Sequence, residues 1–185
     1  METFYHGTTQ LFNKFSLKHI LEGTGKIKFG YGVYLTSSYK SAAHYSAVDG
    51  GMHYVYTVKI PKLTENNFIA FKQKVPQHLI ESAQVLTGKP LTNKIISDGK
   101  EFRKYMVKFF DNKNRLNGEK LTSQWLSNQC IDYIIWPYNW KIGYAGETNR
   151  CLLDVNKIII TQIDEISLDA QTQTQFLIYT LHTHR

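Results

Sequence analysis

Two consecutive stretches decide the fold: Phe29-Gly30-Tyr31-Gly32-Val33-Tyr34-Leu35-Thr36 and Ser37-Ser38-Tyr39-Lys40-Ser41-Ala42-Ala43-His44-Tyr45. The two glycines of the first stretch permit a tight bend. The residues after them are β-branched, aromatic or aliphatic, which is typical of a strand. Ser38 stands where a helix N-cap is expected. The sequence therefore predicts a bend, a short strand over residues 32–36, and a helix that follows Ser38.

Tyr34 and Tyr45 lie eleven residues apart, one on the expected strand and the other on the expected helix. Two tyrosine rings in this relation can enclose a flat aromatic group such as nicotinamide. A tyrosine-rich hairpin with ordinary core packing is the alternative interpretation.

A second motif, His6-Gly7-Thr8, ends a strand expected over residues 3–8. A glycine lets a ligand approach the backbone closely, and the neighbouring imidazole can reach a ribose hydroxyl. Taken alone, the motif is equally compatible with a structural histidine whose ring nitrogens are satisfied within the fold.

Together these segments resemble the NAD-binding half of the ADP-ribosyltransferase family. The resemblance is to the His-Tyr-Glu branch, which includes the poly(ADP-ribose) polymerases and many bacterial toxins. The pattern of that branch is His-Gly-Ser/Thr, then Gly-x-Gly-Val/Ile-Tyr-Phe/Leu, then Ser-Ala-x-Tyr. The matching segments here are His6-Gly7-Thr8, Gly30-Tyr31-Gly32-Val33-Tyr34-Leu35 and Ser41-Ala42-Ala43-His44-Tyr45. The match covers the first sixty residues, with a weaker one near residue 150.

The resemblance implies that NAD is the co-substrate. It implies that His6 binds a ribose hydroxyl, that the Gly7 backbone holds the nicotinamide amide, and that Thr8 adds a hydroxyl contact. Tyr34 and Tyr45 would stack on the nicotinamide ring. The remaining NAD-binding positions that the resemblance implies are Gly32 and Ser41.

The catalytic carboxylate is less clearly placed. Members of the family carry a glutamate at the start of a late strand, and in that alignment Asn149 occupies its place, with Glu147 two residues earlier. Three explanations stay open. Glu147 serves as the carboxylate, Asn149 orients the ribose while the acceptor supplies its own nucleophile, or the domain binds NAD without turnover.

The middle of the chain has a different periodicity. Apolar residues recur at three- and four-residue spacing over 77–86, 100–110 and 119–128, which predicts helices. Strand patterns precede this region and return after residue 130. We expect an α+β, ADP-ribosyltransferase-type fold with a mostly antiparallel split β-sheet. A single domain over 1–168 would carry a helical insertion at about 76–129, and 169–185 would be an edge strand or an extension.

Charge bears on the acceptor. The formal net charge is +7 and the pI is about 9.3, which favours anionic partners. Lys100, Arg103, Lys104 and Lys108 would form a basic ridge on one helix, and Trp140 lies in an aromatic loop before the late strand. We assign these five residues to acceptor binding, with RNA or DNA favoured over protein. A solvated helix face and core aromatics are the alternatives.

Composition excludes several classes. The chain has only Cys130 and Cys151, which are not spaced as zinc ligands, so we expect reduced thiols, no disulfide and no metal. No run of eighteen apolar residues occurs, so no membrane association is expected. We expect the protein to act in the cytoplasm of its producer or of a target cell.

These observations favour a mono-ADP-ribosyltransferase that modifies a macromolecule and releases nicotinamide, because the chain is short and shows no second domain for elongation. Such an enzyme would be a bacterial or phage toxin, effector or defence protein. A toxin would require an inhibitor or antitoxin protein as partner. The rivals are an inactive NAD or ADP-ribose binding module, an NAD glycohydrolase, and a nucleic-acid-binding protein that does not use NAD.

Overall fold

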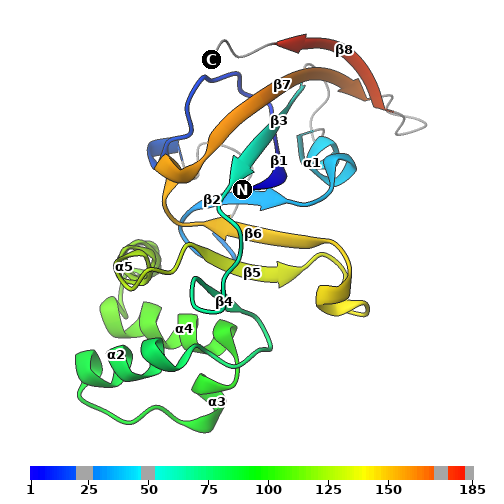
Figure 1. The fold of residues 1–185 in the computed structure, drawn as a ribbon. Coiled ribbons are helices and arrows are strands. Elements are labelled where there is room, and N and C mark those ends of the chain that lie inside the picture. The colour runs from blue at the N-terminus through cyan, green and yellow to red at the C-terminus, as the bar shows by residue number, and fades with distance from the viewer. Residues whose placement is uncertain (20–26, 47–52, 169–174, 182–185) are drawn as a thin grey trace.

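An eight-stranded sheet forms the centre of the computed structural model, which describes residues 1–19, 27–46, 53–168 and 175–181. The strand order is β4-β5-β6-β2-β1-β3-β7-β8, and all neighbours are antiparallel except β4 and β5 (Figure 1). In chain order the strands are β1 (Glu2–Thr8), β2 (Val33–Thr36), β3 (His53–Ile60), β4 (Phe68–Ala70), β5 (Tyr133–Pro137), β6 (Thr148–Leu152), β7 (Ile159–Leu168) and β8 (Gln175–Leu181). The expected α+β fold with a mostly antiparallel sheet is confirmed.

The helices fall into two groups. Helices α2 to α5 gather around the β4–β5 side of the sheet, whereas α1 lies beside β1 and β2 (Figure 1). Within the described residues, none of the helices is long and apolar enough to cross a membrane. The α-helices are α1 (Tyr39–Ser46), α2 (Gln77–Thr87), α3 (Asn93–Ile96), α4 (Gly99–Phe110) and α5 (Arg115–Asn128), and the 3-10 helices are η1 (Leu17–His19), η2 (Gly143–Ala145) and η3 (Val155–Lys157).

The sheet is nearly divided between β1 and β2. Strand β1 pairs with β3 from Glu2 to Thr8, but with β2 only through Tyr5 and Thr36. Strand β2 in turn pairs with β6 along its whole length. Within the described residues, a single register pair therefore joins β1 to β2 in the ladder.

Each face of the sheet has its own core. On one face the helical group packs against β4 to β6 through residues such as Phe71, Phe102 and Trp136. On the other face Phe4 and Tyr56 lie in a second cluster. A small third cluster lies under α1. This arrangement follows from the period-two alternation of the strands.

Most elements agree with those expected from the sequence, and the differences concern short elements and the ends of others. Strand β4 and helix α3 were not expected, because three or four residues are too short to show a period. Helix α5 begins at Arg115, four residues earlier than expected, because the Asn114 side chain accepts a hydrogen bond from Asn117 N at 3.1 Å and caps it. The strand patterns over 150–154 and 157–163 predict two late strands, which run instead over Thr148–Leu152 (β6) and Ile159–Leu168 (β7). Beyond residue 174 the chain forms β8, which pairs with β7 at the sheet edge.

Candidate active site at the split of the sheet

His6 bridges the two halves of the sheet. Its Nδ1 lies 2.9 Å from the Tyr34 carbonyl oxygen of β2. Since a carbonyl only accepts hydrogen bonds, Nδ1 carries the proton. Burial lowers the pKa of His6, against the opposing effect of this hydrogen bond, so the ring is neutral near pH 7. The Nε2 lone pair is then left as an acceptor.

Aromatic rings fix the orientation of the His6 ring. The Phe15 ring centroid lies 5.2 Å away, edge to face, and the Phe12 and Tyr56 rings lie at 6.4 Å. Phe12 and Tyr56 also stack on each other at 4.4 Å. These contacts leave the imidazole little freedom to rotate, so Nε2 has a defined direction.

Tyr34 is held by its hydroxyl. The oxygen accepts hydrogen bonds from Lys28 N at 3.1 Å and Phe29 N at 3.0 Å, and the hydroxyl donates to Gly30 O at 3.0 Å. Burial raises the pKa of the phenol, so it stays protonated and can donate. The ring also meets Trp136 edge to face at 5.6 Å. Its position is therefore set by the loop that precedes β2.

The register of the strands shows which residues share a face. Thr36 lies opposite Tyr5 on one side and opposite Asn149 on the other. Residues directly opposite in a ladder point to the same face, and residues two apart in a strand do so as well. Thr36, Asn149, Tyr34 and Gly7 therefore share one face, whereas His6 points to the other.

Helix α1 covers this face at Gly7. A Cβ atom at Gly7 would lie 1.7 Å from the Ala42 carbonyl oxygen, so any side chain here would displace the helix. The close approach expected at Gly7 is thus made by the protein's own helix. The expected N-cap is confirmed, since Ser41 N donates to Ser38 Oγ at 3.3 Å.

The resemblance assigns two residues of α1 to NAD binding, and they differ in exposure. Ser41 is buried, whereas Tyr45 is 65% exposed. Among the described residues, the Tyr45 ring makes no contact with the Tyr34 ring. The two rings therefore do not stack directly on each other, and Tyr45 is open on the surface of α1.

Asn149 and Glu147 stand at the start of β6. Asn149 is 7% exposed, and no residue in the described parts of the chain hydrogen-bonds its side-chain amide. Glu147 is exposed, and its carbonyl oxygen accepts a hydrogen bond from Tyr138 N at 2.9 Å, which extends the β5–β6 ladder. Strand alternation directs the Asn149 side chain to the face that carries Tyr34, and Glu147 directly precedes the strand.

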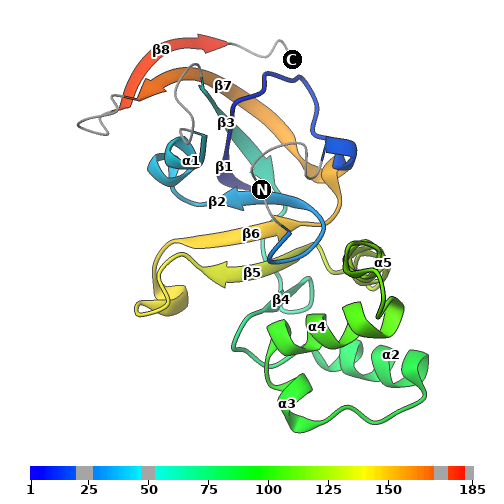
Figure 2. The same cartoon turned by 180° about the vertical axis from the view of Figure 1, so that it is seen from behind.

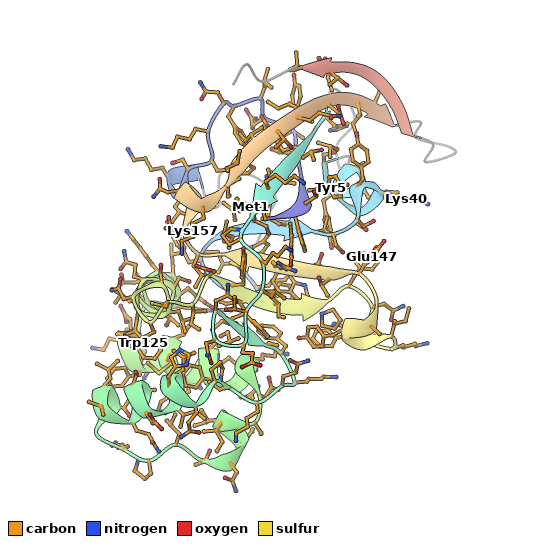
Figure 3. All side chains as sticks on the ribbon, in the orientation of Figure 1. Met1, Tyr5, Lys40, Trp125, Glu147 and Lys157 are labelled. Atoms are coloured by element: carbon orange, nitrogen blue, oxygen red, sulfur yellow. The ribbon has the colours of Figure 1, made fainter. Side chains whose placement is uncertain are left out.

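The loop before α1 joins this end of β6. Ser37 Oγ accepts a hydrogen bond from Thr148 N, and Ser37 N donates to Thr148 O, each at 3.0 Å. Figure 3 shows Glu147 at the same end of the molecule as Lys40 of α1, far from Trp125. Thr36 and Ser37 were not among the expected site residues. Alternation from Tyr34 along the same strand was the signal that could have identified Thr36.

The expected basic ridge needs a correction. Lys104 and Lys108 are exposed and Lys100 is partly exposed, but Arg103 is only 2% exposed. Its guanidinium pairs with the buried Glu119 of α5. A carboxylate in the interior requires a cationic partner, and it draws the arginine inward from the lysine face. Arg103 is therefore not available to an acceptor.

The aromatic segment before β6 divides into two parts. Trp136 is buried and stacks on Phe29 at 4.3 Å between ring centroids. Trp140 and Tyr138 are 45% and 49% exposed, and the Lys72 ammonium lies 4.9 Å from the Trp140 ring centroid. The exposed part lies next to Glu147.

Cys151 is buried, whereas Cys130 is exposed. Burial raises the pKa of the Cys151 thiol, which keeps it protonated. Within residues 1–19, 27–46, 53–168 and 175–181 no group of three His, Cys, Asp or Glu side chains could hold a metal ion.

A split antiparallel sheet, with a His-Gly pair on one side of the split and a strand tyrosine on the other, places the protein among the NAD-using ADP-ribosyltransferases. A family described as "ADP-Ribosyltransferase in polyvalent proteins" matches residues 2–167 of the 185, and the chain belongs to this family. It is an ADP-ribosyltransferase, an NAD-dependent transferase. Comparisons with curated proteins and with solved structures found no match.

Proposed function

We propose that the protein transfers a single ADP-ribose unit from NAD to a macromolecular acceptor. The bond between nicotinamide and ribose C1′ breaks, and its electron pair leaves with nicotinamide. A nucleophile of the acceptor forms the new bond to C1′ and loses its proton to solvent. The products are the modified acceptor, nicotinamide and one proton.

The observation that carries this proposal is the orientation of His6. Its Nδ1–H donates a hydrogen bond to the Tyr34 carbonyl oxygen. Nε2 is therefore free of a proton, has a fixed direction and can accept a hydrogen bond from a ribose hydroxyl. The same hydrogen bond brings the histidine strand next to Tyr34. We place nicotinamide beside Tyr34 at the split between β1 and β2, with the Gly7 backbone, Thr8 and Ser41 as polar contacts and Tyr45 closing over it.

Glu147 is our candidate for the catalytic carboxylate. Cleavage of the nicotinamide bond develops positive charge on the ribose, and a nearby carboxylate stabilises it. Glu147 is exposed and lies two residues before Asn149, which shares a face with Tyr34. Asn149 would orient the ribose through its amide, which has no partner among the described residues.

Nucleic acid is our preferred acceptor. Exposed aromatic side chains stack on bases, and lysines attract phosphates. Tyr138, whose backbone N–H donates to the Glu147 carbonyl oxygen, and Trp140, whose ring lies under the Lys72 ammonium, offer both contacts. Lys100, Lys104 and Lys108 provide further positive charge on α4. Modification of nucleic acid would suit a toxin, effector or defence protein that acts in a cytoplasm and is restrained by an inhibitor protein.

The experiment measures nicotinamide release and transfer of labelled ADP-ribose to RNA, DNA and protein. The wild type is compared with Glu147→Gln and Asn149→Ala. Transfer to RNA or DNA that depends on Glu147 supports the proposal, and transfer to protein alone refutes the nucleic-acid acceptor. Release without transfer indicates an NAD glycohydrolase.

The amide at Asn149 favours a second candidate, an inactive module that binds NAD or ADP-ribose. It predicts NAD binding with no release of nicotinamide in the presence of any acceptor. Restoration of turnover by Asn149→Glu would then show that the missing carboxylate is the cause.

A further inference from the structure

The loop that holds Tyr34 is itself held by the helical group. Residues 28–30 bind the Tyr34 hydroxyl through two N–H groups and one carbonyl. On its other side the same loop meets α4 and α5, and Figure 2 shows the chain that enters β2 running beside α5. The helices and Tyr34 therefore both bind one short segment.

Arg103 of α4 provides the first connection. One guanidinium nitrogen pairs with Glu119, and the other donates to the Lys28 carbonyl oxygen at 3.2 Å. Arg103 and Glu119 are each 2% exposed. Because a guanidinium is planar and its donors have fixed directions, pairing with Glu119 also fixes the direction of the bond to Lys28.

Ser123 of α5 provides the second connection. Its Oγ accepts a hydrogen bond from Tyr31 N at 3.0 Å, and Ser123 is 5% exposed. The Tyr31 hydroxyl in turn donates to Leu17 O at 3.1 Å. The peptide of Tyr31 is thus bonded to a helix that is far away in sequence, directly before β2 begins.

The loop has little space to move between these bonds. Gly30 has a φ of +123°, where a side chain is strained, and a Cβ atom there would lie 2.4 Å from Ile134 Cδ1. Phe29 stacks on Trp136, which also contacts the Tyr34 ring. A shift of the loop would therefore be transmitted to Tyr34 through both its hydroxyl and its ring.

We propose that Arg103 and Ser123 are positioning residues for the NAD site. They fix the loop over residues 28–31, and the loop fixes the ring of Tyr34 against which nicotinamide binds. The inference rests on the proposed role of Tyr34 in NAD binding. The helical group is thereby a structural part of the NAD site.

The test uses Ser123→Ala in the full chain, with Ser127→Ala as the matched control. Ser127 lies one turn further along α5, and its hydroxyl has no hydrogen-bond partner among the described residues. Both variants make the same change in helix propensity. Loss of one hydrogen bond to Tyr31 should raise the KM for NAD about 3- to 10-fold in Ser123→Ala, with kcat within about 2-fold. Ser127→Ala should match the wild type.

Two further measurements separate positioning from general destabilisation. Amide exchange at Tyr31, Lys28 and Phe29 should accelerate in Ser123→Ala and stay unchanged in Ser127→Ala. In a Tyr34→Phe background, which lacks the hydroxyl link but keeps the ring contact with Trp136, Ser123→Ala should raise the KM by a smaller factor than in the wild type.

An active Ser123→Ala with wild-type KM and unchanged exchange would overturn the inference. An equal effect of Ser123→Ala in both backgrounds would overturn it too, since Tyr34 would not be the link. If the wild type releases no nicotinamide, the proposed function fails, and amide exchange alone then decides whether Ser123 holds the loop.

Discussion

The two ends of the β2–β6 pair differ in how their polar groups are used. At the end near Val33, the loop before β2 is bonded to the helices through Ser123 and Arg103. At the end near Thr36, Asn149 has an amide without a hydrogen bond in the described chain, and Glu147 is exposed. One end of the same strand pair is anchored by buried polar contacts, and the other leaves its polar groups open to a ligand.

The largest expected effect lies at the anchored end. Arg103→Ala would leave the Glu119 carboxylate buried without its main partner, which should lower the free energy of unfolding by about 3–5 kcal/mol. Arg115 contacts the same carboxylate at 3.8 Å, but its side chain is 73% exposed. Arg115→Ala should therefore cost less than about 1 kcal/mol. Urea unfolding measures both, and equal losses would show that burial does not distinguish the two arginines.

Much of this contrast could be predicted from sequence, but not all of it. The glycines, Tyr34 and Ser38 are local signals, so the strand, the helix and its cap were predicted to within a residue or two. The burial of the Arg103 side chain was not predictable from such local signals. Its position next to Lys104 and three residues after Lys100 suggested membership of the exposed basic ridge. Its ion pair with Glu119, sixteen residues further along the chain, is what draws the side chain into the interior.

The candidate active site was also only partly predictable from the sequence. His6 and Tyr34 were identified from their motifs, but the hydrogen bond between them joins residues 28 positions apart and has no sequence signal. The reason for glycine at position 7 is the carbonyl of Ala42, which also lies far along the chain. Pairings of this kind depend on strand register, which the sequence pattern does not specify by itself.

At the open end, Glu147 and Asn149 should differ in their effect on catalysis. Glu147→Gln removes the charge and keeps the shape, so nicotinamide release should fall about 100-fold if this carboxylate stabilises the developing positive charge. Asn149→Ala should lower it about 10-fold, because it removes one orienting hydrogen-bonding group. Steady-state release of nicotinamide measures both. The reverse order would assign the main role to Asn149.

The exposed loop beside Glu147 should affect the acceptor and not NAD. Trp140→Ala removes a stacking surface, so transfer to RNA or DNA should fall about 10-fold. Ile142→Ala is the matched control, since Ile142 is 60% exposed in the same segment and offers no ring. Label transfer to nucleic acid measures this effect, and nicotinamide release to water should stay unchanged in both variants. Loss of release in Trp140→Ala would place the tryptophan in the NAD site instead.

The smallest expected effect is the pH dependence that His6 gives to the fold. Burial lowers the pKa of His6 below its usual value of 6.5, so the folded protein binds this proton less readily than the unfolded chain. Protonation therefore favours unfolding, and the contribution of His6 to stability is present above about pH 6.5 and is lost as the pH falls below it. The loss cannot exceed about 1.4 kcal/mol per pH unit for one proton.

Unfolding measured from about pH 7 to pH 5 should thus have a shallower pH dependence in His6→Gln than in the wild type. His44→Gln, an exposed change on α1, is the matched control. Because the comparison uses slopes, packing lost with the His6 ring does not affect it. An unchanged slope in His6→Gln would mean that the imidazole has the same pKa in the folded and the unfolded protein. Burial would then not be the reason why the His6 ring is neutral at the split between β1 and β2. A shallower slope would show that the same burial that anchors His6 also keeps Nε2 unprotonated for the ribose.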